Sequence, residues 1–104
     1  CKTFIHIPDR FLEGYGPNEK ALKALYSKGA ELILTVDCGI SSFEPLKALS
    51  AINLDLIVID HHNPEIMLPP AYAIINPKKD LTKNESSLLC ATALTYFFID
   101  ILIK

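Results

Sequence analysis

Cysteine is scarce in this sequence, and its positions exclude two common kinds of small protein. The chain contains three cysteines, and no two of them form a Cys-x-x-Cys pair. An odd and widely spaced set of this kind argues against a disulfide scaffold and against a cysteine-based zinc site. It fits a reducing compartment, and we therefore expect a cytoplasmic protein. The three residues are Cys1, Cys38 and Cys90.

An excess of positive charge is also missing. Ten lysines and arginines stand against twelve aspartates and glutamates, which gives a formal net charge of −2 and a pI near 5.9. Domains that bind nucleic acid through their whole surface usually have a strongly basic character. The overall charge therefore carries no signature of nucleic-acid binding.

The sequence lacks an initiator methionine and a targeting segment. Its one methionine is Met67, and its first residues do not show the basic start and long apolar run of a signal peptide. We therefore expect a piece of a longer polypeptide. The apolar tail at 88–103 contains Asp100 and is shorter than the ~20 residues that a membrane span requires. This tail predicts a buried helix and no membrane association.

The sequence does contain enough apolar material for one folded domain. Half of the 104 residues are hydrophobic and the mean hydropathy is +0.27, which excludes a disordered chain. Short β-rich runs alternate with segments of helical periodicity, an order typical of an α/β fold with a mainly parallel sheet flanked by helices. We predict strands at 3–7, 31–36, 55–59 and 72–75, and helices at 19–28, from 41 or 42 to 52, and from 85–87 onward.

Two of these helices have clear sequence signals. Asn18 can cap the first helix, the apolar residues Leu22, Leu25 and Tyr26 share one of its faces, and Gly29 stands where a glycine commonly ends a helix. The closing helix is apolar on nearly every face, which predicts that it is well buried.

Acidic and histidine side chains follow two of the predicted strands. Asp37 comes directly after the second strand, and Asp60, His61 and His62 follow the third. Open parallel sheets bind ligands just beyond the carboxyl ends of their strands. Two carboxylates at that edge repel each other unless a cation or a proton lies between them. A single aspartate there is more often a helix cap or a turn former. The pair, with imidazoles beside it, favours a site for Mn²⁺ or Mg²⁺.

Two further residues near these strand ends have competing interpretations. Arg10 follows the first predicted strand, where its guanidinium suits bidentate phosphate recognition. A structural salt bridge to Asp9 or Glu13 is an equal alternative. Cys38 follows Asp37, but no partner base lies in its segment, which favours a small packing residue over a ligand or nucleophile.

Four short blocks of the sequence resemble a known family. Residues 58–62, Val-Ile-Asp-His-His, are similar to the signature of the DHH phosphoesterase superfamily. Residues 7–18, with Pro-Asp-Arg-Phe-Leu-Glu-Gly-Tyr-Gly, resemble a segment of the RecJ-type single-strand-specific DNA exonucleases, and so do 35–41 and 75–78. The resemblance covers residues 4–80 with order and spacing preserved, and it implies a Rossmann-like DHH domain core.

The resemblance implies a role for each matching residue. Asp37 would bridge two divalent metals, Mn²⁺ or Mg²⁺, and His61 would bind one of them. Asp60 would orient the site without binding the metal itself, and His62 would face the scissile phosphate. Arg10 would bind phosphate or the DNA strand. The implied reaction is two-metal hydrolysis of single-stranded DNA from the 5′ end, releasing mononucleotides, in DNA repair and recombination.

The chain also departs from the family pattern. An earlier Asp-x-Asp motif, a later metal-binding aspartate and a C-terminal substrate domain with a Gly-Gly-His motif are missing, and residues 89–94 lack the usual glycine. Only Asp37 and His61 remain as metal ligands, too few for two ions. We therefore expect residues 1–104 to be a partial DHH domain that is inactive by itself.

Two alternatives remain open at this point. The chain could belong to another DHH phosphoesterase, such as a manganese-dependent inorganic pyrophosphatase or an oligoribonuclease. It could also be a non-catalytic DHH scaffold that binds a replication or repair protein instead of single-stranded DNA. The preference of the intact enzyme for substrate length would distinguish the first alternative from a single-strand-specific exonuclease. A degenerate upstream Asp-x-Asp motif would favour the second alternative.

Overall fold

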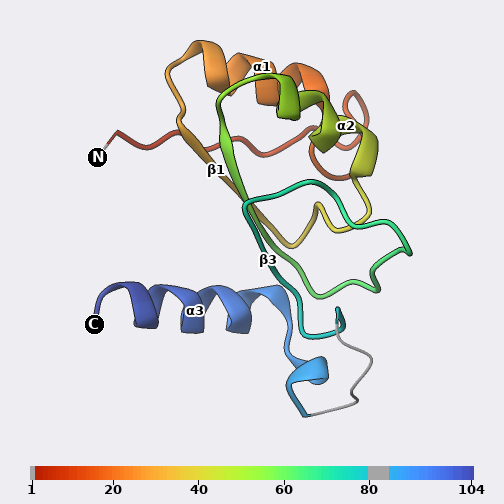
Figure 1. The fold of residues 1–104 in the computed structure, drawn as a ribbon, viewed down its shortest axis with the longest axis vertical. Helices are drawn as coiled ribbons and strands as arrows, with labels where there is room; N and C mark the ends of the chain where they lie inside the picture. The colour runs from red at the N-terminus through yellow and green to blue at the C-terminus, as the bar shows by residue number, and fades with distance from the viewer. Residues whose placement is uncertain (1, 80–84) are drawn as a thin grey trace.

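The computed structural model describes residues 2–79 and 85–104, and Cys1 lies outside them. Within these residues a three-stranded parallel sheet is flanked by helices, as Figure 1 shows, and the α/β class predicted from the sequence is confirmed. The strands are β1 Leu32–Val36, β2 Asp55–Ile59 and β3 Ala73–Ile75. The helices are α1 Glu19–Ser27, α2 Phe43–Lys47 and α3 Ala91–Leu102, with short 3₁₀ helices η1 Ala48–Ala51 and η2 Glu85–Leu88.

The strands end in line with one another. The sheet order is β1-β2-β3, with Val36 paired to Ile59 and Ile59 paired to Ile75. The residue that follows each strand therefore emerges at the same edge, which we call the carboxyl edge. These residues are Asp37, Asp60 and Asn76.

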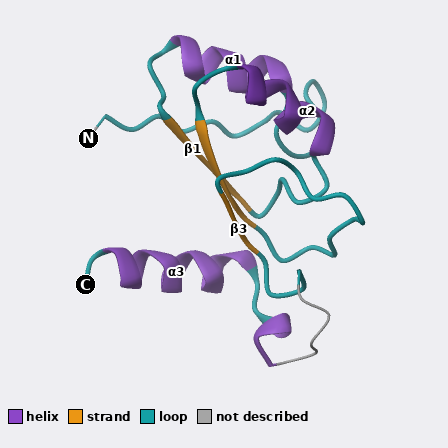
Figure 2. Cartoon of the chain, in the orientation of Figure 1, coloured by secondary structure: helices purple, strands orange, loops and turns teal. Residues whose placement is uncertain are grey.

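One face of the sheet forms the main core with α1, α2 and η1, which lie together on one side of the strands in Figure 2. Buried and exposed residues alternate along β1, as expected for a strand with one covered face. Burial of each large aliphatic side chain contributes about 1.5–3 kcal/mol. The buried cluster contains Leu22, Ile33, Leu46, Leu49, Leu56 and Val58.

Helix α1 follows the signals of its sequence. The Asn18 side chain accepts a hydrogen bond from the amide of Ala21 at 2.8 Å, which satisfies one of the free N–H groups at the start of the helix. Gly29 follows the end of the helix with a φ of +93°, a conformation in which glycine has no steric penalty. The predicted cap and stop of this helix are confirmed.

The strand predicted at 3–7 is not formed, and that prediction is wrong. These residues have no regular secondary structure and pair with no strand in the described part of the chain. The side chains of Ile5 and Ile7 are 85% and 84% exposed. A β-rich sequence forms a strand only when a neighbouring strand satisfies its backbone, and no such neighbour lies beside this segment in the described residues.

The closing helix also differs from its prediction. Residues 85–88 form η2, and α3 begins only at Ala91, on the opposite side of the sheet from α1 and α2 (Figure 1). Within α3 only Ala91 and Leu94 are buried, and Ile101 is 73% exposed, so the expectation of a well-buried helix is wrong. None of the described helices is both long enough and apolar enough to span a membrane.

Replacing Gly39 by alanine should destabilise the fold by about 2–3 kcal/mol, as measured by urea unfolding. Gly39 has a φ of +108°, and an added Cβ would lie 2.7 Å from Oγ1 of the buried residue Thr35 and 3.4 Å from Cγ1 of Val58. Gly29→Ala is the matched control, since it has the same kind of backbone conformation but nothing within 4 Å of the added atom. An equal loss of unfolding free energy in the two variants would contradict the predicted steric overlap between the added Cβ at position 39 and Thr35.

Candidate metal centre at the carboxyl edge

The buried carboxylate at this edge belongs to Asp60. Its side chain is 1% exposed, and it accepts hydrogen bonds from three backbone amides. The amide of Ile40 lies 3.1 Å from Oδ2, and the amides of His61 and His62 lie 2.8 and 3.3 Å from Oδ1. Asp60 thereby joins the segment after β1 to the segment after β2.

The ionised form of Asp60 is favoured by these bonds. Burial by itself raises the pKa of this carboxyl, because it disfavours charge. The hydrogen bonds that it accepts, above all the one from the Ile40 amide, outweigh burial and hold the pKa below its ordinary value of 3.8. Asp60 is therefore a fixed negative charge beneath the site.

Asp60 holds the ring of His62. Nδ1 of His62 lies 2.6 Å from Oδ1 of Asp60, and the imidazole is 45% exposed. With an ionised carboxylate as its partner, Nδ1 carries the proton and donates, which leaves Nε2 as the free ring nitrogen. The side-chain amide of Asn76 also donates to the backbone carbonyl of His62 at 3.0 Å. The position of His62 is thus fixed from both sides.

Asp37 and His61 meet on the exposed side of the edge. Oδ1 of Asp37 lies 3.2 Å from Nε2 of His61, and the Asp37 side chain is 62% exposed. Asp37 has a φ of +62°, a left-handed conformation that aspartate tolerates better than most residues. Its amide donates to the carbonyl of Ile59 at 2.9 Å, which ties it to β2.

A divalent ion fits the donors gathered here. Asp37, His61 and His62 each offer one ligand atom, and these atoms lie within 4.8 Å of one another. Carboxylate and imidazole together suit Mn²⁺. Neighbouring ligands of an octahedral ion, at about 2.1 Å from it, lie about 3.0 Å apart, close to the 3.2 Å between Asp37 and His61. These residues form a possible metal-binding group.

Four of the residues at this centre were predicted from the sequence. Asp37, Asp60, His61 and His62 were expected at one edge, and the structure brings them together. Tyr15 and the side chain of Asn76 also belong to the centre, and no role was predicted for them. The hydroxyl of Tyr15 donates to the carbonyl of Asp37 at 2.5 Å, and its ring meets that of His62 edge-on, with centroids 5.9 Å apart.

A sequence signal existed for each missed residue. Asn76 directly follows the fourth predicted strand, so its place in the chain matches that of Asp37 and Asp60. Tyr15 stands between Gly14 and Gly16, a pattern that indicates a tight turn but does not say which part of the protein the turn contacts.

Arg10 lies outside the cluster. It is exposed, and it forms no ion pair within the described residues. The salt bridge considered from the sequence is not formed, and its two candidate partners make other contacts. Asp9 accepts from the amides of Phe11 and Leu12, and Glu13 contacts the side chains of His6 and Asn18. The substrate-binding role of Arg10 stays a prediction.

Cys38 is half-buried beside the centre. Burial first, and then the nearby carboxylates of Asp60 and Asp37, raise the pKa of its thiol above the ordinary value of 9.0. A raised pKa keeps the sulfur protonated and makes it a poor ligand and nucleophile at neutral pH. This fits the packing role that we expected for Cys38.

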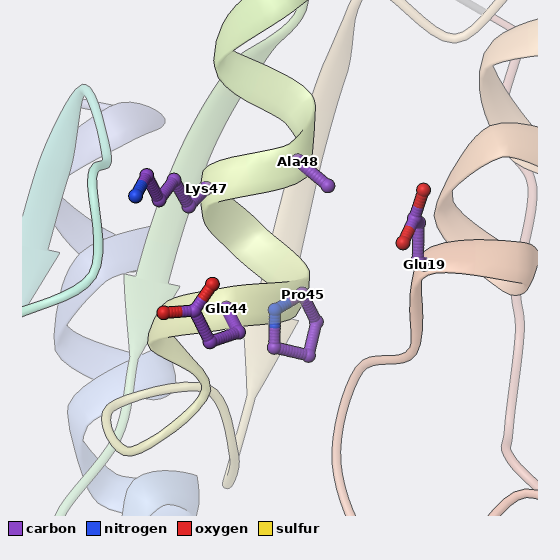
Figure 3. A pocket seen from close by; sticks show the side chains of 5 residues that line it. All are labelled: Glu19, Glu44, Pro45, Lys47 and Ala48. Atoms are coloured by element: carbon purple, nitrogen blue, oxygen red, sulfur yellow. The ribbon is translucent and has the colours of Figure 1, made fainter.

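The groove between α1 and α2 is a separate feature. Figure 3 shows Glu19 facing Ala48 and Pro45 across it, whereas Lys47 points away on the other side of α2. Its lining includes Glu44 and none of the residues of the metal-binding group. The candidate chemistry therefore lies at the open carboxyl edge and not in this groove.

A parallel sheet carries Asp-His-His directly after its central strand and an aspartate after the neighbouring strand, the arrangement that the resemblance to the DHH superfamily implies. The family model described as "DHH family, N-terminal domain" matches residues 2–102, and the chain belongs to this family. Within the family it is similar to the single-stranded-DNA-specific exonuclease RecJ. It is 47% identical to RecJ of Bacillus subtilis over 74 residues, or 71% of this chain, and 36% identical to RecJ of Escherichia coli over 93 residues, or 89% of it.

A solved structure supports the same relationship. The chain matches a crystal structure of exonuclease RecJ bound to manganese with a TM-score of 0.71 and 30% identity, over 93% of this chain and 25% of that one. The chain spans 9% and 16% of the length of the RecJ proteins of B. subtilis and E. coli. The family resemblance stated from the sequence is confirmed.

Proposed function

We propose that residues 1–104 are a partial DHH domain of a metal-dependent exonuclease that degrades single-stranded DNA from the 5′ end, in DNA repair and recombination in the cytoplasm. The observation that carries the proposal is the cluster of Asp37, His61 and His62 in a chain whose relatives are RecJ exonucleases. The manganese in the related crystal structure supports the choice of metal.

Asp37 and His61 would hold the metal. Their ligand atoms are 3.2 Å apart on the exposed side of the edge. Bound Mn²⁺ or Mg²⁺ would neutralise charge on a phosphodiester and lower the pKa of a coordinated water. In the complete enzyme Asp37 and His61 would hold two such ions together with further ligands supplied by the rest of the longer protein.

His62 and Asp60 would act together on the phosphate. The carboxylate of Asp60 keeps the proton of His62 on Nδ1, 2.6 Å away, and leaves Nε2 at the open side of the ring. A ring held in this way can contact a phosphate without losing rotational freedom on binding. Arg10, exposed and unpaired within the described residues, would bind a phosphate of the DNA strand.

The isolated chain should be inactive for lack of ligands. Asp37 and His61 supply two of the six ligands of an octahedral ion, and even with His62 half of the coordination shell would stay unfilled. A two-ion site needs more. The exposed apolar side chains of α3 and of residues 5–7 also fit a domain that packs against further parts of a longer protein.

The test is to assay the complete protein and the 104-residue chain on 5′-phosphorylated single-stranded DNA with Mn²⁺. We expect mononucleotides from the complete protein, none from a blunt duplex of the same sequence, and none from the short chain. Preferential cleavage of pyrophosphate or of RNA dinucleotides would point to a different DHH phosphoesterase. No hydrolysis of any of these substrates would favour a scaffold domain that binds a protein partner.

A further inference from the structure

Tyr15 contacts both sides of the candidate metal centre. Its hydroxyl donates to the backbone carbonyl of Asp37 at 2.5 Å. Its ring stands edge-on to the imidazole of His62, with centroids 5.9 Å apart and planes at 81°. Because the two contacts use different parts of one side chain, substitution can remove them separately.

The turn that carries Tyr15 is shaped to reach this place. Gly14 and Gly16 flank it with φ values of +79° and +87°, which side-chain-bearing residues rarely adopt. Gly16 is buried, and an added Cβ there would lie 3.4 Å from Oγ of Ser42 and 4.0 Å from Cβ of Cys38. The turn is therefore packed against the segment that follows β1, directly beside Asp37.

The hydroxyl acts on the backbone of a proposed ligand. Asp37 turns the chain with a φ of +62°, and its amide is bonded to Ile59 in β2. The bond from Tyr15 to the Asp37 carbonyl secures the other side of the same residue. With both backbone groups held, the Cα–Cβ bond of Asp37 has a set direction before any ion binds, and the contact with Nε2 of His61 at 3.2 Å orients the carboxylate itself.

We propose that Tyr15 is a positioning residue: its hydroxyl aims the Asp37 carboxylate, and its ring edge orients the imidazole of His62. The inference rests on the proposed metal site and extends it to a residue that touches neither the metal nor the reacting phosphate. Its loss should therefore act through metal affinity and turnover, and leave the binding of DNA unchanged.

Two variants of the complete protein separate the two contacts. Tyr15→Phe keeps the ring and removes the hydroxyl, and it should weaken Mn²⁺ binding about 3- to 10-fold, the effect of one lost hydrogen bond, as measured by electron paramagnetic resonance. Tyr15→Leu also removes the ring edge, and it should further lower kcat at saturating Mn²⁺ about 3- to 10-fold. The KM for single-stranded DNA should stay the same in both.

Tyr72→Phe is the matched control, since the Tyr72 side chain is 80% exposed and lies outside the metal-binding group. It should change neither the Mn²⁺ affinity nor kcat. An unchanged Mn²⁺ affinity in Tyr15→Phe would overturn the role of the hydroxyl. A raised KM with normal Mn²⁺ affinity would make Tyr15 a contact for DNA and overturn the positioning role.

The same measurements keep this inference apart from the proposed function. If the wild-type protein binds Mn²⁺ but does not cut single-stranded DNA, the exonuclease proposal fails. The Mn²⁺ affinities of wild type and Tyr15→Phe still decide the role of the hydroxyl in that case. If the wild-type protein binds no Mn²⁺ at all, the positioning role is overturned together with the metal site.

Discussion

Replacing Asp37 by asparagine should lower the exonuclease activity of the complete protein at least about 10³-fold. Loss of several kcal/mol of metal-derived stabilisation of the transition state corresponds to a change of this size. Asparagine tolerates the left-handed backbone at this position as well as aspartate does. The substitution therefore removes the negative charge at the exposed edge and leaves the turn in place. Initial rates on 5′-phosphorylated single-stranded DNA, measured over a range of Mn²⁺ concentrations, test this expectation.

The control for this variant is Asp55→Asn. Asp55 is also an exposed aspartate of the sheet, but it begins β2 and so lies at the opposite edge. Its replacement should leave the rate and the Mn²⁺ dependence unchanged. If Asp37→Asn regained full activity at high Mn²⁺, Asp37 would be one ligand among many and not the bridging ligand. If it kept full activity at low Mn²⁺, the proposed metal centre would be wrong.

The location of the site could be predicted from the sequence because strand ends can be recognised there. Apolar runs mark β1 and β2, and a parallel arrangement brings the residues after them to one edge. The structure pairs Val36 with Ile59, which places Asp37 beside Asp60. Hydrophobic pattern and sheet topology are sufficient to place Asp37 and Asp60 at the same edge.

The different environments of the two aspartates could not be predicted in the same way. Each follows an apolar strand, yet the side chain of Asp37 is 62% exposed and that of Asp60 is 1% exposed. The difference arises from backbone turns and from amides such as that of Ile40, 20 residues away from Asp60. Local sequence pattern contains no information on such a partner, so it could not show that Asp60 holds His62.

The two wrong predictions about secondary structure and burial have a common physical cause. Ile5 and Ile7 are good strand residues, and α3 is apolar enough for a core helix. Propensity and hydropathy describe what a segment would do against a suitable partner. Neither tells whether that partner is present, and within the described residues these segments remain largely exposed. The contact of Tyr15 with Asp37 has a different cause: it joins residues 22 positions apart, and a local sequence pattern does not identify so distant a partner.

Replacing Asp60 by asparagine should reduce both stability and activity. One oxygen of Asp60 accepts from the Ile40 amide, and the other accepts from the amides of His61 and His62 and from the ring of His62. An asparagine has one oxygen, so its NH₂ group must face N–H donors on one of the two sides. Because buried donors are then left unpaired, the free energy of unfolding should fall by about 3–4 kcal/mol, as measured by urea unfolding at pH 7. The activity should fall by about 10²-fold, because the ring of His62 loses its acceptor.

The pH dependence of the loss of stability in Asp60→Asn gives an independent check. The pKa of Asp60 is lower in the folded protein than its ordinary value of 3.8, so its ionised form stabilises the fold above that pH. This stabilisation is lost as the pH falls through the folded-state pKa, and the difference in unfolding free energy between wild type and Asp60→Asn should shrink from pH 5 toward pH 3. Asp55→Asn again serves as the control variant, because Asp55 is exposed and begins β2 at the opposite edge of the sheet. A difference that stays constant over this range would show that Asp60 does not act through its charge.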